Sequence, residues 1–370
     1  MGESVKDRGA GGPPAGSQDR VRSGIPRLDY ILKGGFHKGG TYNLLGPPGS
    51  GKTVLGNQLC FHHAREPDGR CVYLSLLVES HTKMLAHMAS LRFFNPEAVG
   101  DRIYYVSGYQ QLRDGGPEAL LHLIRATVQE RKATVLVIDG MESLRHFAKG
   151  EQHVKEFVHE LQAFTYMAGC TTLLMCFKDP SYTFTENAVV DGVIELSYTL
   201  VGPRAVRELT VHKFRGGDYL LGKHEVEIGD QGIVVHPRTE IQFDKPPAQA
   251  TEQRVRMAFG VQGLDRMLWG GLPSGSTAAL LGAPGAGKTL LGLSFLVEGA
   301  RRGQKGVYFG FYEPPPRLLE KAGSVGIELE QYVRQGLIEV IWQPPLEHML
   351  DSLAEQLLEK IREQQEPRRR

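Results

Sequence analysis

Two segments of this sequence combine glycine, lysine and threonine at the spacing that is typical of phosphate-binding loops. Residues 46–53 read GPPGSGKT and residues 282–289 read GAPGAGKT, so both fit the pattern GxxxxGK[ST]. The glycines let successive backbone N–H groups curl around an anion, the lysine contributes a positive charge, and the threonine hydroxyl reaches Mg²⁺. Each segment follows an apolar run, YNLL or AALL, that we predict to be a strand, and each precedes a predicted helix. We therefore predict two sites for the phosphates of a nucleotide.

The residues of both loops, with the residue after each, are the predicted nucleotide ligands. In the first loop they are Gly46, Gly49, Ser50, Gly51, Lys52, Thr53 and Val54. In the second loop they are Gly282, Gly285, Ala286, Gly287, Lys288, Thr289 and Leu290. Thr53 and Thr289 are also predicted magnesium ligands, because a hydroxyl oxygen suits this hard cation. The alternative, an accidental match in a glycine-rich turn, is disfavoured by the predicted strand before each loop and the helix after it.

Nucleotide hydrolysis needs further groups: a carboxylate near the metal, a base that orients water, and cations that neutralise developing charge. Asp139 ends the apolar run VLVID and is the predicted metal-side and catalytic carboxylate. Glu79 and Glu313 follow the runs YLSLLV and YFGFY and are candidates to orient water, while Lys52 supplies charge. The alternatives are a capping role for Asp139 and, for the two glutamates, stabilisation of a helix N-terminus.

An internal repeat organises the elements that must position these residues. Residues 24–60 align with residues 260–296 without a gap, and about half of the aligned positions are identical. In the first copy, apolar runs such as TYNLL, IYYVS, TVLVID and TTLLMCF alternate with helical stretches over 117–130 and 154–167. This alternation predicts an α/β domain with a mostly parallel sheet. Three short strand-like runs over 208–236 predict an antiparallel extension of that sheet.

The same reasoning divides the chain into four parts. We predict a disordered leader over 1–22, a first ATPase domain over 23–236, and a polar linker over 237–256. Residues 257–370 repeat the first domain up to a final amphipathic helix, and the repeat offset puts the counterpart of Asp139 just past Arg370. We therefore expect 257–370 to be the N-terminal half of a second domain.

Composition argues against several other classes of protein. Apolar residues make up 41 % of the 370, and the formal net charge is +1, which argues against disorder and against a strongly basic nucleic-acid scaffold. No apolar run approaches the roughly 20 residues that span a bilayer, so we expect a cytoplasmic protein without membrane association. The four cysteines lack CxxC spacing and lie in or beside apolar runs, which favours buried thiols.

These ordered motifs together resemble the KaiC family, circadian clock ATPases and autokinases within the wider group of RecA- and DnaB-type ATPases. The resemblance runs from about residue 23 to the end of the chain. It is carried by GIPRLDYILKGG and its repeat, both loops, VESHTKMLAHMASL, EPPPRLLEKAGSVG, VLVIDG, DGVIEL and HKFRGGDYLLGKHEVEIGDQGIVVHP. It implies a RecA-like P-loop fold duplicated in tandem with the second copy incomplete. It also implies ATP and Mg²⁺ as cofactors, and a two-tier homo-hexamer with ATP between neighbouring subunits.

The resemblance adds residues that spacing alone does not single out. Lys213 and Arg215 of HKFRGG match a lysine and an arginine that reach the ATP held by the neighbouring subunit, where they would neutralise transition-state charge. The alternative for this pair is an exposed strand with alternating charges. Further nucleotide-contacting positions of the family are matched by Ser90, Gly217, Tyr219 and Asp230.

One departure from the family pattern bears on hydrolysis. Relatives carry two adjacent glutamates after the second strand, and the first is the favoured base. Val78 and Tyr312 occupy that position here. We therefore expect either that Glu79 takes over or that hydrolysis is slow and the first ring is chiefly a nucleotide-held platform.

The leading interpretation is an ATPase that acts as a nucleotide-dependent oligomeric signalling or clock-type protein with protein partners. Ser/Thr autokinase activity is expected only if a continuing second domain carries phosphorylation sites. A RecA- or DnaB-like ATPase acting on DNA is an alternative, weakened by the lack of a zinc ribbon and of a basic excess. A non-hydrolysing, nucleotide-gated scaffold is a further alternative, motivated by Val78 and Tyr312.

Overall fold

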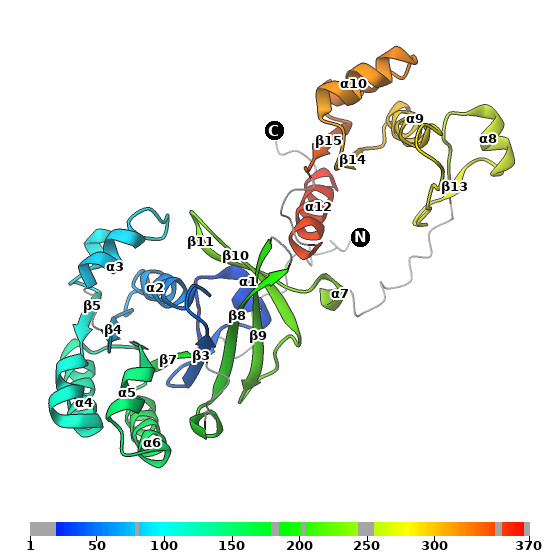
Figure 1. The fold of residues 1–370 in the computed structure, drawn as a ribbon. Helices are drawn as coiled ribbons and strands as arrows, with labels where there is room; N and C mark the ends of the chain where they lie inside the picture. Colours follow the sequence, from blue (N-terminus) through cyan, green and yellow to red (C-terminus); the bar gives the residue numbers. More distant parts are fainter. Residues whose placement is uncertain are drawn as a thin grey trace, which may run out of the picture. The chain divides into compact units, whose positions relative to one another are not determined.

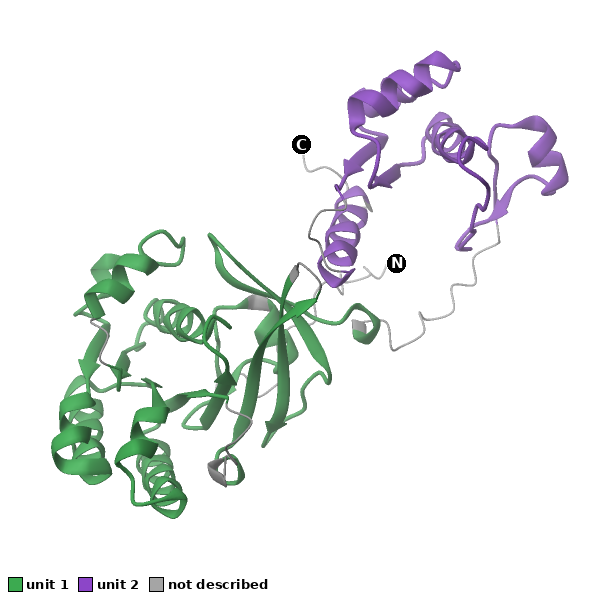
Figure 2. Cartoon of the chain, in the orientation of Figure 1, with its two compact units in different colours: residues 1–242 green, residues 243–370 purple. Residues whose placement is uncertain are grey.

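The chain forms two compact units, residues 1–242 and 243–370, which we describe separately (Figure 2). The computed structural model describes residues 20–77, 81–178, 185–201, 204–242, 255–344 and 350–365. Regular structure begins with β1 (Arg20–Val21), which pairs with β2 (Phe36–His37), inside the last residues of the predicted leader. The short helix α7 (Thr239–Gln242) lies inside the predicted linker. No described helix is both long enough and apolar enough to cross a bilayer.

The first unit is built around a mostly parallel sheet. Among its described residues, nine strands lie in the order β11-β10-β9-β8-β3-β7-β6-β4-β5 (Figure 1). Their bounds are β3 (Thr41–Gly46), β4 (Cys71–Ser75), β5 (Ile103–Ser107), β6 (Val135–Asp139), β7 (Thr171–Phe177), β8 (Gly192–Val201), β9 (Arg204–Phe214), β10 (Lys223–Gly229) and β11 (Gly232–His236). The strands from β8 to β5 are parallel, and β9, β10 and β11 extend the sheet antiparallel. The predicted α/β class and antiparallel extension are confirmed.

Helices cover both faces of this sheet, because alternate residues of its central strands point to opposite sides. Val137 and Met175 face a core shared with α1 (Pro26–Ile31), α2 (Lys52–His63) and α3 (His81–Met88). Ile138 and Leu174 face a second core with α4 (Tyr109–Arg131), α5 (Met141–Phe147) and α6 (Glu151–Met167). The 3₁₀ turns η2 (Pro96–Ala98) and η3 (Thr185–Ala188) complete the described elements of the unit.

Helix α4 is longer than the helix that we predict from the sequence. It begins at Tyr109, eight residues before the predicted start at Pro117. Gly116 breaks the helical path with φ 70° and ψ −168°, so α4 consists of two helical segments. Proline fits directly after this break, because a helix tolerates it in its first turn.

The second unit repeats only part of this architecture. The antiparallel pair of β12 (Arg256–Met257) and β13 (Leu272–Pro273) corresponds to β1 and β2, and the parallel pair of β14 (Gly306–Gly310) and β15 (Ile338–Trp342) corresponds to β4 and β5. The described helices are α8 (Gln262–Met267), α9 (Lys288–Arg301), α10 (Pro315–Ser324), α11 (Leu329–Arg334) and α12 (Leu350–Gln365). Apolar side chains of α9, α10, α11 and β15 form one small core around Leu293, Leu318 and Ile338.

The strand predicted over AALL, before the second P-loop, is wrong. Residues 277–283 form no strand, although the equivalent β3 lies in the middle of the first sheet. Leu281 is 91 % exposed, whereas its counterpart Leu45 is 4 % exposed. The physical reason is pairing: β3 is hydrogen-bonded to β7 and β8, and the described part of the second unit holds no counterpart of either strand.

Candidate nucleotide-binding site

The first P-loop connects the carboxyl end of β3 to the N-terminus of α2. Gly49 and Gly51 have φ of 76° and 107°, a region that residues with a side chain rarely adopt. A Cβ on Gly51 would also lie 2.7 Å from Cδ1 of Ile228, so strand β10 packs directly against the loop. The helix then begins at Lys52, which directs its first backbone N–H groups toward the loop. Val54 packs against the adjoining core.

The lysine of this loop is held by the loop itself. Nζ of Lys52 donates to the carbonyl oxygens of Gly46 at 2.6 Å and Pro47 at 3.0 Å. Burial lowers the pKa of Lys52, and the nearby carboxylates of Glu142 and Asp139 oppose that shift. A phosphate group would offer this ammonium an anionic acceptor in place of two neutral carbonyls.

Asp139 and Thr53 meet beside the loop, at the carboxyl edge of the sheet. The Thr53 hydroxyl donates to Oδ2 of Asp139 at 3.3 Å, and the buried Tyr73 hydroxyl donates to the same oxygen at 2.7 Å. Among the described residues, no group of three His, Cys, Asp or Glu could hold a metal ion. A carboxylate with a threonine hydroxyl suits Mg²⁺, which keeps several waters and takes further oxygens from a substrate phosphate.

Ser50 supplies an independent sign that the loop accommodates a polar ligand. The residue is fully buried, and its hydroxyl oxygen has no hydrogen-bond partner among the described residues. A buried hydroxyl without a partner costs free energy that a bound oxyanion would recover. The loop residues therefore fit a nucleotide phosphate, and Thr53 with Asp139 fits its Mg²⁺.

The structure adds two residues that the sequence reasoning missed. Tyr73 lies in the middle of β4 and holds Asp139; its apolar run gives no indication of that contact. Glu142 lies in the first turn of α5, where its carboxylate accepts a hydrogen bond from the backbone N–H of Phe177. Burial raises the pKa of Glu142, and Lys52 opposes the shift. The only sequence signal for Glu142 is that it lies three residues after Asp139, at the start of the helix that follows β6.

Lys213 and Arg215 lie away from this loop. Both residues follow Arg207, the residue of β9 that reaches the loop: the Nε of Arg207 donates to the Gly49 carbonyl at 3.3 Å. Lys213 pairs in register with Val193, near the amino end of β3. Six residues of strand separate Arg207 from Lys213, about 20 Å. The Lys213 ammonium donates to the carbonyls of Asn187 and Ala188, and the Arg215 guanidinium to those of Ala188 and Val189.

The remaining predicted contacts of the first unit fall in two places. Asp230, in the turn between β10 and β11, forms an exposed ion pair with Arg92 at 2.6 Å, and Ser90 lies just before Arg92 with its hydroxyl on the His87 carbonyl. Gly217 lies beyond β9, where a Cβ would come 2.8 Å from a guanidinium nitrogen of Arg20. Glu79 and Val78 lie outside the described residues.

The second P-loop has the same local conformation as the first. Gly285 and Gly287 both have φ of 83°, and Nζ of Lys288 donates to the carbonyls of Gly282 at 2.7 Å and Ala283 at 2.9 Å. The backbone of Ala286 closes the same turn as that of Ser50. Helix α9 starts at Lys288 and continues through Thr289 and Leu290. This loop is more exposed than the first.

Glu313 is engaged by its own unit. Its carboxylate forms an ion pair with Lys321 of α10 at 2.7 Å. Tyr312, which occupies the position of the missing first glutamate, is 86 % exposed. The Glu313 carboxylate therefore contacts helix α10 rather than Thr289.

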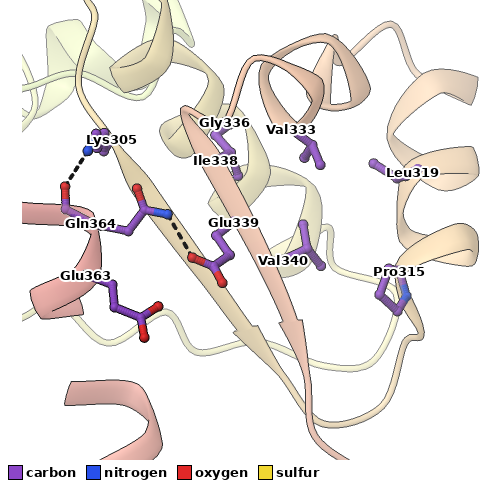
Figure 3. A pocket seen from close by; sticks show the side chains of 10 residues that line it. All are labelled: Lys305, Pro315, Leu319, Val333, Gly336, Ile338, Glu339, Val340, Glu363 and Gln364. Atoms are coloured by element: carbon purple, nitrogen blue, oxygen red, sulfur yellow. Dashed lines mark hydrogen bonds between the residues drawn. The ribbon is translucent and has the colours of Figure 1, made fainter. Parts of the chain in front are cut away.

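A separate pocket of about 500 Å³ lies where β15 faces α12 (Figure 3). Gln364 connects the walls of this pocket. Its backbone carbonyl accepts a hydrogen bond from the Lys305 ammonium at 2.6 Å, and its side-chain amide donates to the Glu339 carboxylate at 2.7 Å. The lining includes no residue of the second P-loop. We therefore assign no nucleotide contact to this pocket.

A parallel sheet with a P-loop after a central strand, and an aspartate at the end of another strand beside the loop threonine, define a P-loop nucleotide-binding protein of the RecA-like α/β type. Comparison with known proteins agrees. The family described as "ATPase: KaiC" matches residues 21–240 and 257–367. The chain belongs to the KaiC ATPase family.

Three relatives illustrate the extent of the similarity. The circadian clock oscillator protein KaiC of Rippkaea orientalis is 27 % identical over 338 residues, which cover 88 % of this chain and 64 % of that protein. The KaiC of Picosynechococcus is 26 % identical over 93 % of this chain and 68 % of its own length. KaiC 1 of Synechocystis is 25 % identical over 97 % and 70 %. The chain therefore spans about two thirds of the length of these relatives.

Proposed function

We propose that the first unit binds Mg²⁺·ATP at residues 46–54 and hydrolyses it. The convergence of the loop, Thr53 and Asp139 at one sheet edge carries this proposal. Asp139 orders the metal, Lys52 leaves the loop carbonyls for the terminal phosphates, and the buried Ser50 hydroxyl gains an acceptor. The second loop, with Lys288 and Thr289, is a further ATP site, and residues 257–370 form the N-terminal half of a second ATPase domain.

The hydrolytic site is completed by a neighbouring copy of the chain. Lys213 and Arg215 lie near the amino end of β3, whereas the P-loop lies at its carboxyl end. Fixed strands hold these ends apart, so the two cations serve a nucleotide bound to another subunit. Such head-to-tail contacts close into a ring, and the family membership favours a homo-hexamer.

The nucleotide state then controls assembly, because a ligand that binds only the assembled form stabilises it by mass action. We propose a cytoplasmic signalling role with protein partners, of the clock type named for the relatives. Ser/Thr autokinase activity belongs to this proposal only where a continuing second domain carries phosphorylation sites.

Mixing two inactive variants tests the shared site. Lys52→Ala removes the loop charge and Lys213→Ala removes the neighbour's cation, so each variant alone loses ATP turnover. In an equal mixture, about one quarter of the interfaces join an intact loop to an intact Lys213, so turnover returns to roughly that fraction of wild type. Lys149→Ala, an exposed substitution on the same unit, is the matched control. If hexamers are shown to contain both variants and ATP turnover still does not return, the site is not made by two subunits.

A non-hydrolysing, nucleotide-gated scaffold is the second candidate function, and the ion pair between Glu313 and Lys321 favours it for the second unit. Assembly that depends on ATP and releases no phosphate would support the scaffold over the ATPase. If Lys52→Ala and Lys288→Ala both still bind ATP, both candidate functions are contradicted.

A further inference from the structure

The proposed hydrolysis in the first unit needs a base, and the inference below rests on that proposed function. The attacking water must lose a proton, and a positioned carboxylate is a common acceptor. The position favoured in relatives is occupied by Val78, which cannot accept a proton. Another carboxylate near the P-loop would resolve this difficulty.

Glu142 lies beside the P-loop, although it follows a different strand. Its carboxylate accepts from the N–H of Phe177, the last residue of β7. Phe177 is paired in register with Gly46, the first residue of the loop, and the N–H of Lys178 donates to the Gly46 carbonyl at 3.3 Å. The same carbonyl accepts from the Lys52 ammonium at 2.6 Å. A chain of backbone contacts thus places the Glu142 carboxylate at the edge where the phosphates bind.

The charges around Lys52 support the same placement. Burial lowers the pKa of Lys52, and Glu142 opposes that shift more strongly than Asp139 does. Two carboxylates therefore lie near this ammonium from the side of β6 and α5. Asp139 is held by Tyr73 and Thr53, and its position suits the metal. Glu142 has no part in that pair and remains for a second role.

We propose that Glu142 is the catalytic base of the first site. The oxygen of a water molecule forms a bond to the γ-phosphorus of ATP as the bond between that phosphorus and the β–γ bridging oxygen breaks. ADP leaves with the electron pair of the broken bond. The proton of the water passes to the Glu142 carboxylate and then to the phosphate product, so the residue is unchanged after each turnover.

The competing explanation is that Glu142 only anchors the end of β7 through the Phe177 N–H. Two substitutions separate these roles. Glu142→Gln keeps a side-chain carbonyl that accepts from Phe177 but has no usable basicity, whereas Glu142→Ala removes both functions. Glu160→Gln is the matched control, since Glu160 is an exposed residue of α6 that pairs with Arg125 at 3.1 Å.

The experiment uses the full chain and measures ATP affinity with a fluorescent ATP analogue, phosphate release, and thermal unfolding. We expect Glu142→Gln to lower the turnover number by about 100-fold or more while ATP affinity changes by less than about threefold. Its Tm at pH 7.5 is not lowered, because burial raises the pKa of Glu142 and disfavours its charged form. Glu160→Gln turns over ATP like the wild type.

Several results would overturn the assignment. Turnover of Glu142→Gln close to wild type, with loss only in Glu142→Ala, makes the residue an anchor for β7. A larger loss in Glu79→Gln than in Glu142→Gln makes Glu79 the base. In both cases the wild type still hydrolyses ATP and the proposed function stands. A wild-type hexamer that binds ATP without releasing phosphate removes the ATPase function itself, and with it any base.

Discussion

Replacing Tyr73 with phenylalanine tests how the sheet holds Asp139. Tyr73 is fully buried, and its hydroxyl donates to Oδ2 of Asp139 at 2.7 Å. Phenylalanine keeps the ring and its packing against Tyr105, so the substitution removes little more than one hydrogen bond. The Asp139 carboxylate is left with Thr53, whose hydroxyl is 3.3 Å away. The variant thus isolates the contact that orients the proposed metal ligand.

The expected size follows from the charge of the acceptor. A hydrogen bond to an ionised group contributes about 1.5–3 kcal/mol, and about 2 kcal/mol is the central expectation here. For a unit of 242 residues, that lowers Tm by about 4–8 °C. Tyr105→Phe is the matched control, because the Tyr105 hydroxyl donates at 2.7 Å to the neutral Asn57 amide. We expect its loss to be about 1 kcal/mol.

The assay is urea unfolding of the full chain in a double-mutant cycle. The free energy of unfolding is measured for Tyr73→Phe, Asp139→Asn, the double variant and the wild type. Since the asparagine carries no charge, Tyr73→Phe is expected to cost about 1 kcal/mol less in that background. An equal cost in both backgrounds, or a cost no larger than that of Tyr105→Phe, would refute the reasoning.

Three further predictions rest on other parts of the first unit. Burial lowers the pKa of His63 from 6.5 to about 4, so the folded protein favours the neutral imidazole. As the pH falls from 6.5 to 4, the unfolded chain binds a proton at His63 before the folded protein does, and up to about 3 kcal/mol of folding stability is lost. We expect His63→Gln to flatten the pH dependence of urea unfolding in that window. Gly35→Ala lowers stability by more than about 2 kcal/mol, because φ is 104° and the new Cβ would lie 2.5 Å from the Val21 carbonyl oxygen. Gly100→Ala, with φ of 86° and open space around it, costs only about 1 kcal/mol, and equal Tm losses would contradict the clash. The four cysteines are buried thiols, so a thiol reagent labels them only as the chain unfolds, and rapid labelling of the folded protein is the contrary result.

The sequence sufficed for the features that depend on neighbouring residues in the chain. Runs such as VLVID and TTLLMCF identify central strands, because a strand buried on both faces is apolar throughout. The P-loop pattern likewise specifies its own turn. The repeat then transfers one copy's interpretation to the other, and the transfer succeeds for α9, β14 and β15.

Features that depend on distant partners were out of reach. AALL and YNLL are both apolar, yet AALL stays irregular because the described residues of the second unit include no strands that would flank it. The contact of Tyr73 with Asp139 depends on the pairing of β4 with β6, and that of Glu142 with Phe177 on the pairing of β6 with β7. Sequence patterns give the type of an element but not its neighbours in a sheet.

The two P-loops keep one conformation even though only the first is preceded by a strand. A loop that is already shaped loses little conformational entropy when a phosphate binds, because that loss occurs during folding. What changes on binding is the lysine, which must exchange two carbonyl acceptors for the phosphate oxygens. The affinity of each site for ATP therefore includes this exchange of partners by the lysine, and owes little to the ordering of the eight-residue loop.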